Sequence, residues 1–76
     1  MILYEIEKVI DDIYLGNLEN IETRIIDLLS KVMVEGVNDE IKFLDIVKVI
    51  DVEIKNKNFI YICDLLKFEL IKLLNN

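Results

Sequence analysis

The chain has 76 residues, of which 54% are hydrophobic and 32% charged, and it lacks both alanine and proline. A chain of this length holds one small domain, and its richness in large aliphatic side chains excludes an intrinsically disordered tail. A net charge of -6 with a single arginine, Arg24, argues against nucleic-acid binding, because contacts to phosphates need clustered basic side chains.

The only cysteine, Cys63, has no partner for an intramolecular disulfide, and no basic segment precedes an apolar stretch at the N-terminus. These two features favour a reducing, cytoplasmic location. The longest run of apolar residues, from Phe59 to Cys63, is far shorter than the roughly 20 residues that a membrane helix requires. We therefore expect no membrane partner.

The small size of the chain also bears on whether it folds alone. Surface scaling for 9.0 kDa predicts about 5,000 Å² of accessible surface in the folded chain. The apolar burial that this implies nearly cancels the conformational entropy lost on folding, and it is an upper bound, because unfolded chains already bury part of their surface. Association with a second chain would add stability.

The first two expected helices are bounded by the two glycines. Apolar residues spaced i, i+3, i+4, i+7 predict an amphipathic helix over residues 2–14, which Gly16 would end by adopting a positive φ. Asn17 is placed to cap a second helix over residues 18–35, whose apolar side chains share an arc of about 100°. Gly36 closes this second helix.

The third segment, residues 39–55, begins with acidic residues suited to a helix N-terminus and carries an apolar face about 160° wide. A β-hairpin near residues 51–62 is the alternative, because Asp51 to Ile54 alternate in polarity and residues 59–62 have high strand propensity. Residues 44–50 do not alternate, and an isolated hairpin needs another surface to cover it. These two facts favour the helix.

The fourth segment, residues 59–74, follows Asn58, which we expect to cap its N-terminus. Its core face is an arc of about 120° that includes Cys63 and Leu66. Taken together, the segments predict an all-α fold, a small antiparallel bundle of four short helices forming one domain over residues 1–76, with three helices and a hairpin as the alternative.

A second apolar stripe runs along the fourth helix at Tyr61, Leu65 and Phe68, among charged side chains. Val49 and Val52 lie among charges on the outer side of the third helix. These five residues, which we call the outer strip, are either additional core or a contact with a second protein, and aromatic side chains on a rigid helix favour the contact. Phe68→Asp is expected to convert a homodimer to a monomer.

Groups suited to catalysis are scarce. The chain has no histidine, and Thr23 and Ser30 carry its only hydroxyl groups outside tyrosine. Cys63 lies on the expected core face, where a thiol acts as a small hydrophobe. We therefore expect no enzymatic activity, cofactor or metal.

Acidic residues that share a helix face are also expected to be structural. The acidic pairs are Glu7 with Asp11 and Glu19 with Glu22, both predicted to lie on solvated faces. Asp51 falls within the apolar arc of the third helix, where an unpaired charge is costly, so we expect Lys55 to pair with it one turn later. A polar contact of Asp51 across an interface is the alternative.

Residues 58–70 resemble a pattern found in short uncharacterised bacterial helical proteins, in which an acidic residue or Asn and an aromatic residue precede Ala-Asp-x-Leu-x-Tyr-Glu-Leu. Asp64, Glu69 and Leu70 match this pattern, whereas Cys63 replaces its small residue and Phe68 its tyrosine. The resemblance implies a C-terminal helix and carries no known activity.

Small size, amphipathic helices and the outer strip predict a non-enzymatic protein-interaction module that binds itself, as a homodimer, or another protein, and acts as an adaptor, regulator or small chaperone. The alternative is an immunity or antitoxin-like protein whose charge of -6 complements a basic partner.

Overall fold

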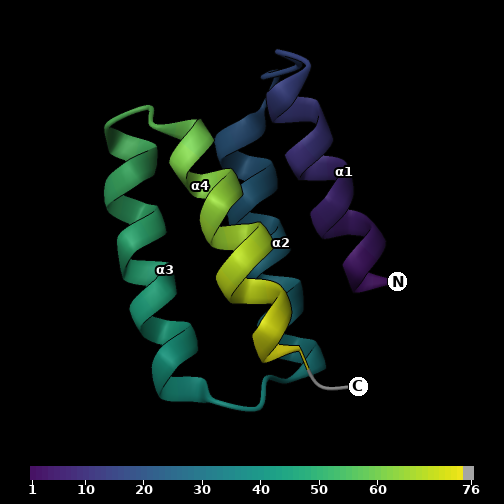
Figure 1. The fold of residues 1–76 in the computed structure, drawn as a ribbon, viewed down its shortest axis with the longest axis vertical. Helices are drawn as coiled ribbons and strands as arrows, with labels where there is room; N and C mark the ends of the chain where they lie inside the picture. Colours follow the sequence, from purple (N-terminus) through teal and green to yellow (C-terminus); the bar gives the residue numbers. More distant parts are fainter. Residues whose placement is uncertain (75–76) are drawn as a thin grey trace.

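The structure, a computed structural model, describes residues 1–74 and is all-α, as predicted (Figure 1). Its elements are α1 (Ile2–Tyr14), α2 (Ile21–Glu35), α3 (Glu40–Lys55) and α4 (Phe59–Leu65), followed by a π-helical turn (Leu66–Leu70) and a 3-10 turn (Ile71–Leu73). We call α4 and these two turns together the C-terminal helix. Because residues 51–55 finish α3 and residues 59–62 begin α4, the hairpin alternative is wrong.

The C-terminal helix lies between α1 and α3, with α2 behind it (Figure 1). The C-terminal helix packs closely against α1 and α3, and α1 also packs against α2. By contrast, α2 and α3 hardly approach each other, although they are consecutive in the chain. The four helices therefore enclose the core on three sides and leave the α2–α3 side open.

The core is formed by aliphatic side chains from every helix, joined by Phe43 and Cys63. Residues with no exposed surface include Ile6, Ile25, Ile50, Ile62, Leu66 and Leu70. The accessible surface is 4942 Å², close to the value of about 5,000 Å² expected for a folded chain of this mass.

The end of α1 explains why α2 starts later than predicted. Gly16 adopts a φ of 79°, and the Asn17 backbone N–H donates to the Asp12 carbonyl at 2.8 Å, which is the hydrogen-bond pattern of a Schellman motif. Asn17 therefore finishes α1 and does not cap the next helix. The prediction that α2 begins at residue 18 is wrong, since it begins at Ile21.

The end of α3 repeats this motif without a glycine. Lys57 takes the left-handed position with a φ of 58°, and the Asn58 N–H donates to the Glu53 carbonyl at 2.9 Å. Asn58 stands at the N-cap of α4, as predicted, but its side-chain amide donates to the Glu53 carboxylate at 2.7 Å and makes no capping bond to α4.

The loop between α2 and α3 holds the end of the C-terminal helix. Asp39 caps α3 by accepting a hydrogen bond from the Lys42 backbone N–H at 3.0 Å. Its neighbour Asn38 donates from its backbone N–H to the Leu73 carbonyl at 2.9 Å and from its side-chain amide to the Lys72 carbonyl at 3.1 Å. Asn38 thus satisfies two carbonyls that the helix terminus leaves without partners.

Candidate interaction surfaces

The outer strip lies along the seam between α3 and the C-terminal helix. These elements run antiparallel, with the Lys42 ammonium 3.9 Å from the Glu69 carboxylate and the Asn58–Glu53 bond at the other end. Val49 is seven residues after Lys42 and therefore lies on the same edge of α3. Along the helix axes, Val49 is therefore at the same height as the part of the C-terminal helix that carries Tyr61 and Leu65.

The outer strip is not enclosed by its own chain. Four of its five residues are exposed, namely Tyr61, Phe68, Val49 and Val52, and Leu65 is half-buried. Phe68 is 55% exposed, and the Lys67 ammonium lies 5.4 Å from the centre of its ring. The predicted strip therefore exists as an exposed surface, on which apolar side chains alternate with charged ones.

A second apolar surface, which the sequence did not predict, lies between α2 and α3. This α2–α3 groove has a volume of about 640 Å³. Its floor is buried and includes Leu29, Phe43, Ile50 and Ile54. Apolar side chains also line its rim, with Ile26 and Met33 on α2 and Leu44 on α3, and all three are exposed.

Side chains of α3 reach the groove because of their helical spacing. The groove is lined by Leu44, Val47 and Asp51, which follow one another at intervals of three and four residues and so share one face. Glu40 stands one turn before Leu44 on the same face. Leu44 is part of the apolar face about 160° wide that the sequence predicts for this helix. A face of that width has more apolar side chains than its neighbouring helices cover, and this was the sequence signal for an open side of the bundle.

The structure corrects one expectation at the groove edge. Lys55 pairs with Asp51 at 3.2 Å, as predicted, but both side chains are exposed. Asp51 is therefore not a buried charge within the core. A second ion pair lies at the end of the groove where α3 finishes. It joins Glu22 of α2 to Lys57, which follows α3, and so bridges the two helices.

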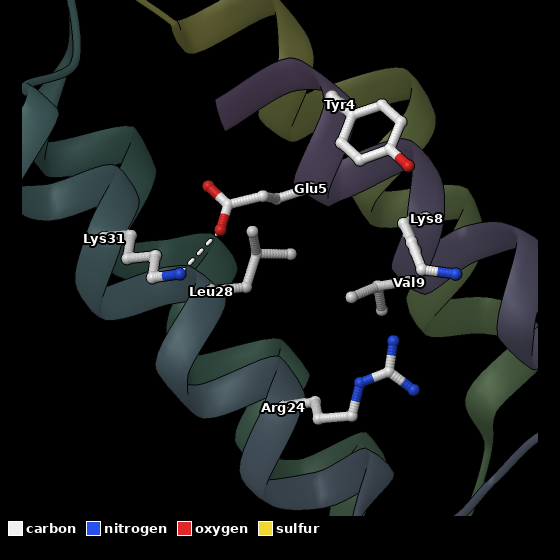
Figure 2. Close-up of a pocket in the computed structure, with 7 residues that line it drawn as sticks. All are labelled: Tyr4, Glu5, Lys8, Val9, Arg24, Leu28 and Lys31. Carbon is white, nitrogen blue, oxygen red and sulfur yellow. Dashed lines mark hydrogen bonds and ion pairs between the residues drawn. The ribbon is translucent and has the colours of Figure 1, made fainter. Parts of the chain in front are cut away.

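The other side of α2 meets α1 in a narrow cleft of about 210 Å³ (Figure 2). Glu5 of α1 reaches across to Lys31 of α2, and the two charged groups are 2.5 Å apart. Arg24 donates a hydrogen bond of 2.6 Å to Asp12, the one buried charged residue within residues 1–74. The side chains of Val9 and Leu28 lie between the Glu5–Lys31 contact and the Arg24 side chain (Figure 2).

These contacts neutralise the charges of the cleft. The hydrogen bond from Arg24 holds the pKa of Asp12 below its usual value, and the hydrogen bond from Lys31 does the same for the pKa of Glu5. The same contact with Glu5 raises the pKa of Lys31. Because these cations already have carboxylate partners, the α1–α2 cleft acts as a structural seam.

The remaining predicted residues lie where the sequence placed them, except Glu22. Cys63 is fully buried, and its thiol lies 4.0 Å from the Ile10 carbonyl. Burial raises the pKa of Cys63 to about 11, with a smaller contribution from the negative charge of Asp64. Glu7, Asp11 and Glu19 are exposed, whereas Glu22 is partly buried and paired with Lys57.

In residues 1–74, no group of three or more His, Cys, Asp or Glu side chains is arranged to hold a metal ion. None of the helices in this part of the chain combines the length and apolar character needed to cross a membrane.

No known protein family, curated protein or solved structure matches the chain significantly.

Proposed function

We propose that this protein is a non-enzymatic interaction module that self-associates and acts as an adaptor, regulator or small chaperone. The supporting observation is the presence, within residues 1–74, of two separate surfaces that carry exposed apolar side chains, the outer strip and the α2–α3 groove. Exposed apolar side chains that gather on one face and are bordered by polar residues are characteristic of protein-binding sites. Such a module works in the cytoplasm, where its single buried thiol stays reduced.

The small core gives self-association a thermodynamic reason. A chain of this length gains little net stability from its own burial, and a partner that binds only the folded state adds to that stability. In the outer strip, Phe68 and Tyr61 would supply aromatic contacts, the residue type that contributes most to protein interfaces. In the groove, the rim of Ile26, Met33 and Leu44 would be covered.

A complex with a basic protein is the second candidate. The net charge of -6 favours a partner of opposite charge and would speed its approach. An immunity or antitoxin-like role belongs to this class. Its distinguishing property is an affinity that falls steeply as the salt concentration rises.

Sedimentation velocity of the full chain over a thousandfold range of concentration tests self-association. We expect the sedimentation coefficient to rise from that of a 9.0 kDa monomer to that of a dimer as concentration increases. Because burial of apolar surface drives this association, 0.5 M NaCl should leave it largely intact. A purely monomeric protein at millimolar concentration would rule out the homodimer and leave a module that binds a different protein.

A further inference from the structure

We propose that the α2–α3 groove is filled by α3 of a second copy of this chain, in a symmetric dimer whose two-fold axis passes beside Leu44. This inference rests on the proposed self-association and assigns it to one of the two apolar surfaces. Each copy would place its own α3 in the groove of the other, so that the same patch is used twice, as a two-fold interface requires.

The charges beside Leu44 identify the occupant. Glu40 and Lys48 stand four residues before and after Leu44, which is about 6 Å in each direction along the helix. Both are exposed, and neither has an ion-pair partner in residues 1–74. Most of the other lysines near α3 are already engaged, including Lys42 with Glu69 and Lys55 with Asp51.

An antiparallel copy of α3 would match these charges. A two-fold axis beside Leu44 brings the two Leu44 side chains together and sets Glu40 of each copy level with Lys48 of the other. The pairing occurs twice, once on each side of the axis. A parallel copy in the same register would instead oppose Glu40 to Glu40, and like charges facing each other are unfavourable. The charge pattern is thus self-complementary in the antiparallel arrangement.

The exposed apolar side chains agree with the same axis. Leu44 is 46% exposed, and Ile41, three residues before it, is 76% exposed. In the antiparallel register Ile41 would meet Val47 of the second copy, which is half-buried at the groove edge. Ile26 and Met33 on the α2 rim would cover the other flank of the inserted helix. Apolar anchors surrounded by paired charges form the usual anatomy of an interface.

The first experiment compares three single substitutions in the full chain by sedimentation equilibrium. Leu44→Asp places a charge on the axis, twice in each dimer, and we expect it to weaken dimerisation by at least about a hundredfold. Phe68→Asp disrupts the outer strip. The sequence alone predicted that it would break a homodimer, whereas a dimer formed through the groove should be unchanged by it. Ile60→Asp is the matched control, because Ile60 is 54% exposed and belongs to neither surface.

The second experiment uses charge reversal at two exposed positions, where no buried contact is lost. Glu40 lies in the first turn of α3, where a negative charge is favourable, so Glu40→Lys also costs the helix some stability. Glu40→Lys or Lys48→Glu alone creates two like-charge contacts in each dimer and should weaken dimerisation about tenfold. The double variant Glu40→Lys with Lys48→Glu restores complementarity and should restore most of the affinity. Circular dichroism of each variant checks that the helical content of the monomer is retained.

The outcomes separate the two proposals. If wild-type protein dimerises but only Phe68→Asp disrupts the dimer, the groove inference is overturned and the outer strip is the interface. Failure of the double charge reversal to recover affinity would overturn the antiparallel register. If the wild-type chain is monomeric throughout, self-association itself is wrong, whatever the variants do.

Discussion

Helix α2 has two long sides that differ sharply. Its α1 side is closed, because Val9 and Leu28 are buried and the Glu5–Lys31 and Asp12–Arg24 contacts join the two helices. Figure 2 shows Val9 and Leu28 between the Glu5–Lys31 contact and Arg24. Its α3 side is open along most of its length and is bridged at one end by the Glu22–Lys57 pair. One helix of ordinary composition therefore forms a finished seam on one side and an exposed apolar surface on the other.

The difference indicates what each side is for. A seam that is closed by packing and ion pairs contributes to the stability of the monomer. The exposed apolar rim of an open groove contributes little to the stability of the monomer. It contributes free energy to binding when a partner covers it and removes it from water. Substitutions on the two sides of α2 should therefore separate stability from association.

The largest effect on folding is expected from the closed side. Leu28 is 3% exposed, and Leu28→Ala should lower the free energy of unfolding by about 2–5 kcal/mol. Ile26, two residues earlier on the open side, is 53% exposed, and Ile26→Ala should change it by about 0.5 kcal/mol or less. Urea denaturation at concentrations where the protein is monomeric measures both, and equal losses would contradict the comparison.

A smaller loss is expected when the closed seam loses one partner of an ion pair. Arg24→Ala leaves the buried Asp12 carboxylate without its main hydrogen-bond donor and should destabilise the monomer. Adding Asp12→Ala should recover part of the loss, because the unpaired charge is then removed. Lys31→Ala, at an exposed pair, is the matched control and should have less effect than Arg24→Ala in the same denaturation experiment.

Asn38, in the loop between α2 and α3, anchors the end of the C-terminal helix. Asn38→Asp removes the amide donor to the Lys72 carbonyl but leaves the backbone bond to Leu73 in place. The expected loss is about 1 kcal/mol in the free energy of unfolding. Hydrogen exchange should locate the change in the last turn of the C-terminal helix. An equal change in exchange at the start of α1 would contradict this assignment.

The smallest effect is a gradual dependence on pH. The lowered pKa values of Asp12 and Glu5 mean that both carboxylates bind protons less readily when the chain is folded. Their contribution is fully present above the ordinary values of 3.8 and 4.5 and is lost as pH falls through the lower folded values. Wild-type stability should therefore decline in this acidic range, and the decline should be shallower in the variant carrying Arg24→Ala and Asp12→Ala.

Much of the fold could be predicted from the sequence because the chain is strongly periodic. The spacing of apolar residues fixed the helices, and Gly16 and Gly36 marked the ends of two of them. The start of α2 was mispredicted because Asn17 is an equally good residue for beginning a helix or for completing a Schellman motif. Only the hydrogen bond from Asn17 to Asp12 decides between them.

The surfaces were harder to predict than the helices. Helical periodicity identifies the residues that share a face, so the outer strip could be found from Tyr61, Leu65 and Phe68. The groove depends instead on how far apart α2 and α3 lie, and this distance is set by the C-terminal helix between α1 and α3. Periodicity within α3 carries no information about that separation.

The enclosed thiol offers a readout that needs no engineered label. Cys63 faces Ile10 of α1 from the C-terminal helix, so a reagent reaches its sulfur only when these two helices separate. Its alkylation rate, compared with that of a short peptide, would measure how often the C-terminal helix lifts away from α1. If a bound partner makes this separation of the helices rarer, the alkylation rate of Cys63 falls, and the fall in rate measures partner binding.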